Sequence, residues 1–244
     1  MEIILLAGQA GVGKTTAAKL IAAEAFAKGF IPVLESFAGP IKQEALEKGY
    51  AKDKLPEKYR QYCQNRGAIA RQESPDYWVD LMKERIDKIC IQEKEDFNKG
   101  KKYWERVIII DDCRYLNEVN YGIILKASLL FLSYGNRVFK NNSWRVHESE
   151  ELANSIANGD KDMASLFDYI IKNDKSQKDF EEKIKSIIPN VLGYTVHDEE
   201  DCGCPACTST YEVTLGIEEL LELLDFDNID YKNYDEEEDL DEET

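Results

Sequence analysis

The stretch from Gly8 to Thr16 reads GQAGVGKTT and lies between an apolar run, Ile3 to Ala7, and a helical pattern that continues from Ala17. It is therefore a glycine-rich turn between an expected strand and an expected helix. Its spacing matches G-x-x-x-x-G-K-[ST] in the strand and helix context that a phosphate-binding loop requires. This motif is the strongest signal in the sequence and predicts a nucleotide site at the end of the first strand.

Each residue type in this loop has a chemical reason for its position. Glycines at 8, 11 and 13 let successive backbone N–H groups turn toward phosphate oxygens without Cβ clashes, and the helix start adds its positive dipole end. The Lys14 ammonium would bridge the β and γ phosphates, and the Thr15 hydroxyl would complete the coordination of Mg²⁺. The expected ligand is ATP with Mg²⁺, bound by Gly8, Gln9, Ala10, Gly11, Val12, Gly13, Lys14, Thr15 and Thr16.

Length and composition indicate a folded body with an appendage. The chain has 244 residues, and 43% of them are hydrophobic, which is enough for one α/β domain with a substantial core. No run of eighteen apolar residues exists, and the first residues lead directly into a strand. We therefore expect neither a membrane span nor a signal peptide, and a cytoplasmic location.

The net charge of −17 belongs to the C-terminal part of the chain. Residues 193–244 carry 19 of the 48 acidic residues and a single basic one, Lys232, which leaves 29 acidic and 30 basic residues elsewhere. A nearly neutral body suits a small anionic ligand held by local Lys and Arg side chains, and no direct nucleic-acid binding is expected. Eight of the last ten residues are acidic, a composition typical of disorder or of a segment that binds a protein partner.

A second candidate site is a cluster in this acidic segment. One imidazole and three thiols within eleven residues have the chemistry of a tetrahedral Zn²⁺ site, although Cys-x-Cys-x-x-Cys lacks the usual paired Cys-x-x-Cys spacing. Free thiols in a loop are the favoured interpretation, in a reducing compartment. The four residues are His197, Cys202, Cys204 and Cys207.

The remaining chain alternates strand and helix patterns, which predicts a mostly parallel sheet with helices on both faces. The expected strands are 3–7, 31–38, 107–110, 128–135 and 167–174. The expected helices begin near residue 14 and then cover 40–49, 55–72, 75–97, 117–127 and 176–188. We therefore predict a P-loop kinase fold, a three-layer α/β/α domain over residues 1–192 with a five-stranded sheet, followed by an acidic Cys-containing extension, 193–244.

Polar residues follow the later strands, where ligands bind in open α/β sheets. Asp111 and Asp112 end the third strand, and Arg114 comes directly after it. Between the fourth and fifth strands, Arg137 and Arg145 lie in a polar stretch that we expect to form a lid over the phosphates. Asn173, after the fifth strand, is expected at the edge of the donor adenine pocket.

Several blocks in one order resemble the bacteriophage-type deoxynucleoside monophosphate kinases, within the P-loop nucleoside monophosphate kinase group. They span about residues 2–188 and are GQAGVGKTT, SFAGPIKQEA, RQYCQNRGAIARQESPDYWVDLM, VIIIDDCRYLNE, HESE and DYIIKND. The resemblance implies a P-loop kinase fold and phosphoryl transfer from ATP·Mg²⁺ to a deoxynucleoside monophosphate. The P-loop is widely shared, whereas D-x-R-x-x-N-E combined with SFAGPIK and HESE is far narrower.

The resemblance also implies roles for matching residues. Asp112 would lie near Mg²⁺ and Arg114 on the phosphates, although Asp111 leaves open which acid serves the metal. The chain departs from the family pattern at Gly39, which stands where an Asp is common. The residues implied at the acceptor nucleotide are Phe37, Lys42, Arg60, Gln64, Arg66, Arg71 and Trp78.

The two lines of reasoning lead to one hypothesis and two alternatives. Phosphoryl transfer requires mainly that the protein positions the reactants and neutralises their charge. The residues expected to do so are Lys14, Asp112, Arg114, Arg137 and Arg145. The first alternative is a P-loop kinase of another small phosphorylated metabolite. The second is a nucleotide-binding module whose acidic tail docks onto a protein partner, and a homodimer is considered as well. No sequence rule reads the base or the sugar of the acceptor.

Overall fold

The computed structural model describes residues 1–99, 105–134 and 148–193. These residues divide into two compact units. Unit 1 contains residues 1–35 together with 105–134 and 148–193, and unit 2 contains residues 36–99. The part of the chain after residue 193, which includes most of the predicted extension, lies outside the described residues.

Unit 1 is built on a five-stranded sheet in the order β2-β3-β1-β4-β5. All four pairings are parallel, so the sheet that the sequence predicts as mostly parallel is parallel throughout its described strands. The fold is of the predicted α/β class. The strands are β1 (Glu2–Gly8), β2 (Ile31–Glu35), β3 (Arg106–Cys113), β4 (Ser128–Ser133) and β5 (Tyr169–Lys172).

The central strands are apolar on both faces because the sheet is covered on both sides. Ile4 to Ala7 of β1 and Val107 to Ile110 of β3 are fully buried. β1 lies between β3 and β4, pairing Ile4 with Ile109 and with Ser128. The first strand of the chain is thus the middle of the sheet, and the loop that follows it opens at the centre of the carboxyl edge.

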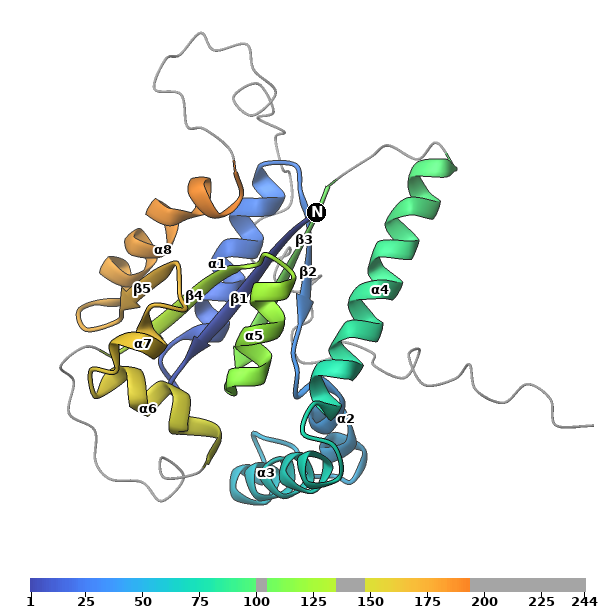
Figure 1. The fold of residues 1–244 in the computed structure, drawn as a ribbon, viewed down its shortest axis with the longest axis vertical. Helices are drawn as coiled ribbons and strands as arrows, with labels where there is room; N and C mark the ends of the chain where they lie inside the picture. Colours follow the sequence, from blue (N-terminus) through green and yellow to red (C-terminus); the bar gives the residue numbers. More distant parts are fainter. Residues whose placement is uncertain (100–104, 135–147, 194–244) are drawn as a thin grey trace, which may run out of the picture. The chain divides into compact units, whose positions relative to one another are not determined.

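The helices of unit 1 cover both faces of this sheet. The β1-to-β2 and β3-to-β4 connections cross the sheet in opposite directions, so right-handed crossovers place α1 (Lys14–Ala27) and α5 (Leu116–Ile124) on opposite faces. α8 (Gln177–Val191) packs beside α1, as Figure 1 shows. A Cβ at Gly122 of α5 would meet Leu129 at 2.8 Å and Leu5 at 3.0 Å, so this helix lies directly on the sheet.

Unit 2 consists of three helices, α2 (Gly39–Glu47), α3 (Pro56–Glu73) and α4 (Tyr77–Asn98). Pro40 and Pro56 stand in the first turns of α2 and α3, where a missing N–H costs nothing. A small core joins the three helices through Ile41, Ala70 and Trp78. The segment that the sequence predicts to bind the acceptor is therefore a compact helical unit.

Several elements differ from the sequence prediction. The second strand ends at Glu35, three residues early, because a turn bonds the Gly39 N–H to the Ser36 carbonyl. The last helix continues past Pro189 to Val191, which is buried. A 3₁₀ turn, Glu148–Glu150, and two short helices, α6 (Glu151–Ala157) and α7 (Lys161–Ala164), were not predicted.

Within residues 1–99, 105–134 and 148–193, no helix combines the length and the apolar sequence that crossing a membrane requires.

Candidate functional site: a phosphate loop in unit 1 and the surroundings of Arg66 in unit 2

The phosphate loop of unit 1 has the backbone that its glycines predict. Gly8, Gly11 and Gly13 have φ values of 140°, 79° and 104°, which L side chains rarely adopt. Gly13 directly precedes the first residue of α1, so the loop ends at a helix N-terminus. The chain thereby presents the turn and the dipole end on which anion binding depends.

Lys14 is folded back onto this loop. Its side chain is buried, and Nζ donates hydrogen bonds to the carbonyl oxygens of Gly8, at 2.6 Å, and Gln9, at 3.0 Å. Burial lowers the Lys14 pKa from 10.5 to about 8; the nearby Arg114 also lowers it, and nearby carboxylates oppose the shift. The ammonium is thus held beside the loop, and the effect of burial on its pKa outweighs that of the nearby carboxylates.

The first half of the loop is fixed by side chains from distant parts of unit 1. The Ala10 N–H donates to Glu150 Oε2 at 2.9 Å, and the Ala10 carbonyl accepts from the Tyr134 hydroxyl at 2.8 Å. Gln9 Nε2 donates to Asn154 Oδ1 at 3.1 Å. Asn173, predicted at the donor pocket, donates from Nδ2 to the Val12 carbonyl at 3.0 Å. The loop is therefore held in place before any ligand binds.

An acidic side chain reaches the loop from the end of β3. The Thr15 hydroxyl donates to Asp111 Oδ2 at 3.0 Å, whereas Asp112 is buried. A hydroxyl and a carboxylate at this separation are the oxygen donors that Mg²⁺ takes in P-loop proteins, so the residues present fit this ion. The structure brings Asp111 beside Thr15, and the metal role of Asp112 stays a prediction.

Arg114 follows β3 and is held at both of its ends by buried glutamates. Glu118 Oε2 accepts from the backbone N–H groups of Arg114, at 2.7 Å, and Tyr115, at 3.1 Å, which closes the turn into α5. The guanidinium forms an ion pair with Glu150 through Nη1 and Oε1. This explains locally why the block DCRYLNE contains a glutamate, because its carboxylate fixes the backbone that carries Arg114.

Arg66 of unit 2 is surrounded by one acidic and several aromatic side chains. Arg66 Nε donates to Glu44 Oε2 at 3.1 Å, and the Tyr62 hydroxyl donates to the same oxygen at 3.0 Å. The guanidinium also lies near the faces of Tyr77 and Trp78, with its central carbon 5.9 and 5.6 Å from the ring centroids. Contacts of this kind orient an arginine while leaving other N–H groups to face a ligand.

The other residues predicted at the acceptor lie in different surroundings of unit 2. Phe37 and Trp78 are buried, at 1% and 2% exposure, and the Trp78 indole donates to the Gly67 carbonyl at 3.3 Å. Lys42 Nζ donates to Ser36 Oγ at 2.5 Å. Arg60 is exposed, and Gln64 and Arg71 are half-buried. Their contacts with an acceptor nucleotide stay predictions.

Several predicted residues fall outside the part of the chain that the structure describes. These are the lid arginines Arg137 and Arg145 and the zinc candidates His197, Cys202, Cys204 and Cys207. Among the described residues, no group of three or more His, Cys, Asp or Glu side chains is arranged to hold a metal ion.

Comparisons with known proteins give structural likenesses that are distant. No protein-family model matches the chain, and no curated protein matches it either. Among solved structures, the chain is similar to shikimate kinase from Bacteroides thetaiotaomicron, with 16% identity and a TM-score of 0.35 over 79% of this chain and 98% of that one. A likeness this distant assigns no substrate, and the fold is described from its strand pairing alone.

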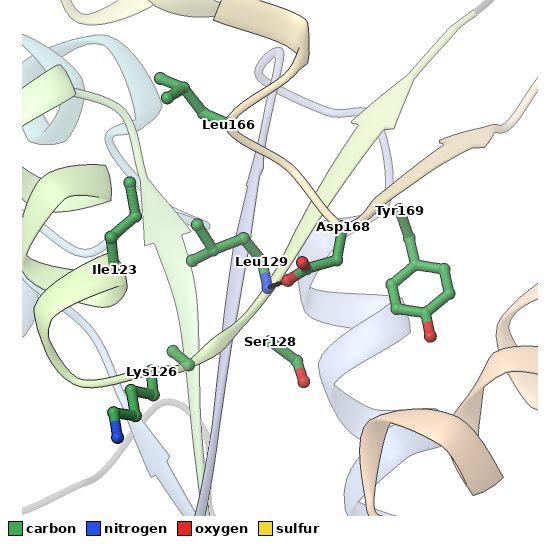
Figure 2. A pocket seen from close by; sticks show the side chains of 8 residues that line it. Ile123, Lys126, Ser128, Leu129, Leu166, Asp168 and Tyr169 are labelled. Carbon is green, nitrogen blue, oxygen red and sulfur yellow. Dashed lines mark hydrogen bonds between the residues drawn. The ribbon is translucent and has the colours of Figure 1, made fainter.

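A hollow of about 480 Å³ lies elsewhere in unit 1, at the amino ends of β4 and β5. In Figure 2 the Asp168 carboxylate points to the backbone N–H of Leu129, which donates to it at 2.7 Å, while Ile123 and Leu166 line the side. Because the strands are parallel, this end of the sheet is opposite the phosphate loop. The hollow therefore does not belong to the phosphate site.

The sequence prediction missed three acidic residues that contact Arg66 or Arg114: Glu44, Glu118 and Glu150. Each accepts hydrogen bonds from a predicted cationic residue or its backbone. Glu118 and Glu150 lie inside blocks on which the family resemblance rests, NE and HESE. Their inclusion in those blocks is the signal by which they could have been found.

Proposed function

We propose that this chain transfers a phosphoryl group from ATP to a deoxynucleoside monophosphate. The observation that carries the proposal is the preorganised loop of unit 1, in which the Lys14 ammonium, the Thr15 hydroxyl and the Asp111 carboxylate lie together beside a helix N-terminus. The order of the sequence blocks that resemble deoxynucleoside monophosphate kinases supports the choice of acceptor. The half-buried Arg66 of unit 2, with its guanidinium oriented by Glu44, is a cation suited to an acceptor phosphate.

In this proposal, the residues of the loop supply charge neutralisation and position. Lys14 exchanges its two loop carbonyls for phosphate oxygens, and Arg114 contributes a second cation at the end of β3. Thr15 and Asp111 would hold Mg²⁺, which neutralises the phosphate oxygens when it is bound. Acceptor phosphates are already ionised, so no general base is required. Transfer to the acceptor also requires that water is excluded, so that ATP is not hydrolysed.

A substrate panel tests the proposal. The purified full chain is incubated with ATP·Mg²⁺ and each of the four common deoxynucleoside monophosphates, their ribose counterparts, and phosphorylated metabolites without a base. ADP and the phosphorylated acceptor are measured by chromatography. We expect a deoxynucleoside diphosphate as product. Exclusive phosphorylation of a metabolite without a base would replace the acceptor assignment, and no transfer to any compound would refute the proposed function.

The lowered pKa of Lys14 predicts a pH dependence for nucleotide binding. Bound phosphate favours the charged ammonium, so the complex keeps a proton that the free protein loses as pH rises through about 8. The terminal phosphate of ADP itself takes up a proton below about pH 7. Affinity for ADP in EDTA, where no metal contributes, should therefore be nearly constant only from about pH 7 to about pH 8. Above it, affinity should fall by up to about tenfold per pH unit.

Calorimetry in buffers of different ionisation enthalpy measures this linkage. At pH 8, binding should take up about half a proton, because about half of the free protein lacks it there. Lys14→Met should abolish both the proton uptake on binding and the fall in ADP affinity above pH 8. A decline of equal steepness in that variant would assign the titration to another group.

A further inference from the structure

Glu150 places a carboxylate between two groups of the candidate phosphate site. Its Oε2 accepts from the Ala10 N–H of the loop at 2.9 Å, and its Oε1 pairs with Arg114 Nη1. The residue is buried, with 3% of its surface exposed. An acid so close to a site for anions repels them unless its charge is neutralised, and here the Arg114 guanidinium neutralises it.

Glu150 is one of two neighbouring residues that bond the loop. Glu150 and Asn154 stand one helical turn apart, and both bond the loop, Glu150 at the Ala10 N–H and Asn154 at the Gln9 side chain. The Arg114 backbone is fixed independently by Glu118. Among the described residues, Glu150 is the side chain that bonds both the Arg114 guanidinium and the loop. It lies 36 residues from Arg114 and 140 residues from Ala10 in sequence.

The exposure of the pair indicates which partner faces a ligand. The Glu150 side chain is 4% exposed, whereas that of Arg114 is 32% exposed. The carboxylate is thus the inner, anchoring group and the guanidinium the outer one. If the acid were instead a latch that leaves when phosphate binds, it would have to move a buried charge away from two partners, which is costly.

We infer that Glu150 is a positioning residue that fixes Arg114 against the Ala10 end of the phosphate loop, so that Arg114 meets a phosphoryl group during its transfer. The inference rests on the proposed function and deepens it. Precise placement of a charge matters most in the transition state, so the effect of losing Glu150 should appear in kcat rather than in KM for ATP.

The test compares Glu150→Gln with Glu151→Gln. Glu151 is the next residue and is exposed, so its variant removes the same charge without touching the loop. With the acceptor found in the panel, Glu150→Gln should lower kcat about tenfold or more and change KM for ATP by no more than about twofold. Glu151→Gln should leave both unchanged. In an Arg114→Ala background, Glu150→Gln should have little further effect on kcat.

Two measurements do not need turnover, so they separate this inference from the proposed function. The ¹⁵N resonances of the Ala10 amide and the Arg114 Nε should shift in Glu150→Gln and not in Glu151→Gln. Affinity for ATP should stay within about threefold of wild type, as expected for a contact that acts in the transition state.

Other results would overturn the inference. Tighter ATP binding in Glu150→Gln would identify the acid as a competing latch. Unmoved Ala10 and Arg114 resonances would show that the bridge formed by Glu150 between Ala10 and Arg114 does not exist in solution. A kcat loss that is fully additive with Arg114→Ala would show that Glu150 does not act through that residue. If wild type phosphorylates nothing while the resonances respond as expected, the proposed function fails and the bridge stands.

Discussion

Lys14→Met abolishes phosphoryl transfer and leaves the thermal midpoint of unfolding at or above that of wild type. The loss should be at least about a hundredfold in kcat, the usual effect of removing one preorganised charge from a transferring group. Stability does not fall because the charged lysine is a cost to the fold. Its pKa is lowered from 10.5 to about 8, and at about 1.4 kcal/mol per unit this corresponds to roughly 3 kcal/mol at neutral pH.

The Lys14→Met variant also loses the two hydrogen bonds of Lys14 to the Gly8 and Gln9 carbonyls. This loss offsets part of the stability gained by removing the buried charge. The matched control is Lys19→Met, which makes the same chemical change on α1 at a half-buried position. It should retain turnover. Turnover and melting are measured on the same preparations. Transfer by Lys14→Met within about tenfold of wild type would show that the loop does not act on the phosphates as proposed.

Gly8→Ala should destabilise the chain by about 3 kcal/mol or more, because it breaks the centre of the sheet as well as the loop. An added Cβ would lie 2.2 Å from the Leu132 carbonyl oxygen, and that atom belongs to β4, which pairs with β1 at this residue. A backbone carbonyl in a sheet cannot rotate away as a side chain can. The φ of 140° is itself unfavourable for alanine.

Gly159→Ala separates these two causes. Gly159 also has a positive φ, 96°, but an added Cβ there meets no atom within 4 Å. Gly159→Ala should lower the free energy of unfolding by about 1–2 kcal/mol, the cost of the backbone conformation alone. Unfolding in guanidinium chloride gives both values. Equal losses at the two positions would show that the close approach of β4 to the loop contributes nothing.

Much of unit 1 could be predicted from sequence because local patterns determined its elements. The GQAGVGKTT spacing requires a turn of the kind observed, and runs such as Val107–Ile110 are apolar because both of their faces are covered. The class of fold followed from the alternation of strand and helix patterns. The short helices α6 and α7 were missed because they are too brief for a periodic apolar pattern to stand out.

The sequence by itself determined the glycine-rich turn before α1, the class of the sheet and the position of Arg114 after a buried strand, since each depends on neighbouring residues. Only the tertiary structure decided that β1 lies between β3 and β4, that Asp111 rather than Asp112 bonds Thr15, and that Glu150 joins Arg114 to Ala10. Those contacts join residues 36 to 140 positions apart. Their partners are chosen by how the strands and helices pack, which no local spacing encodes.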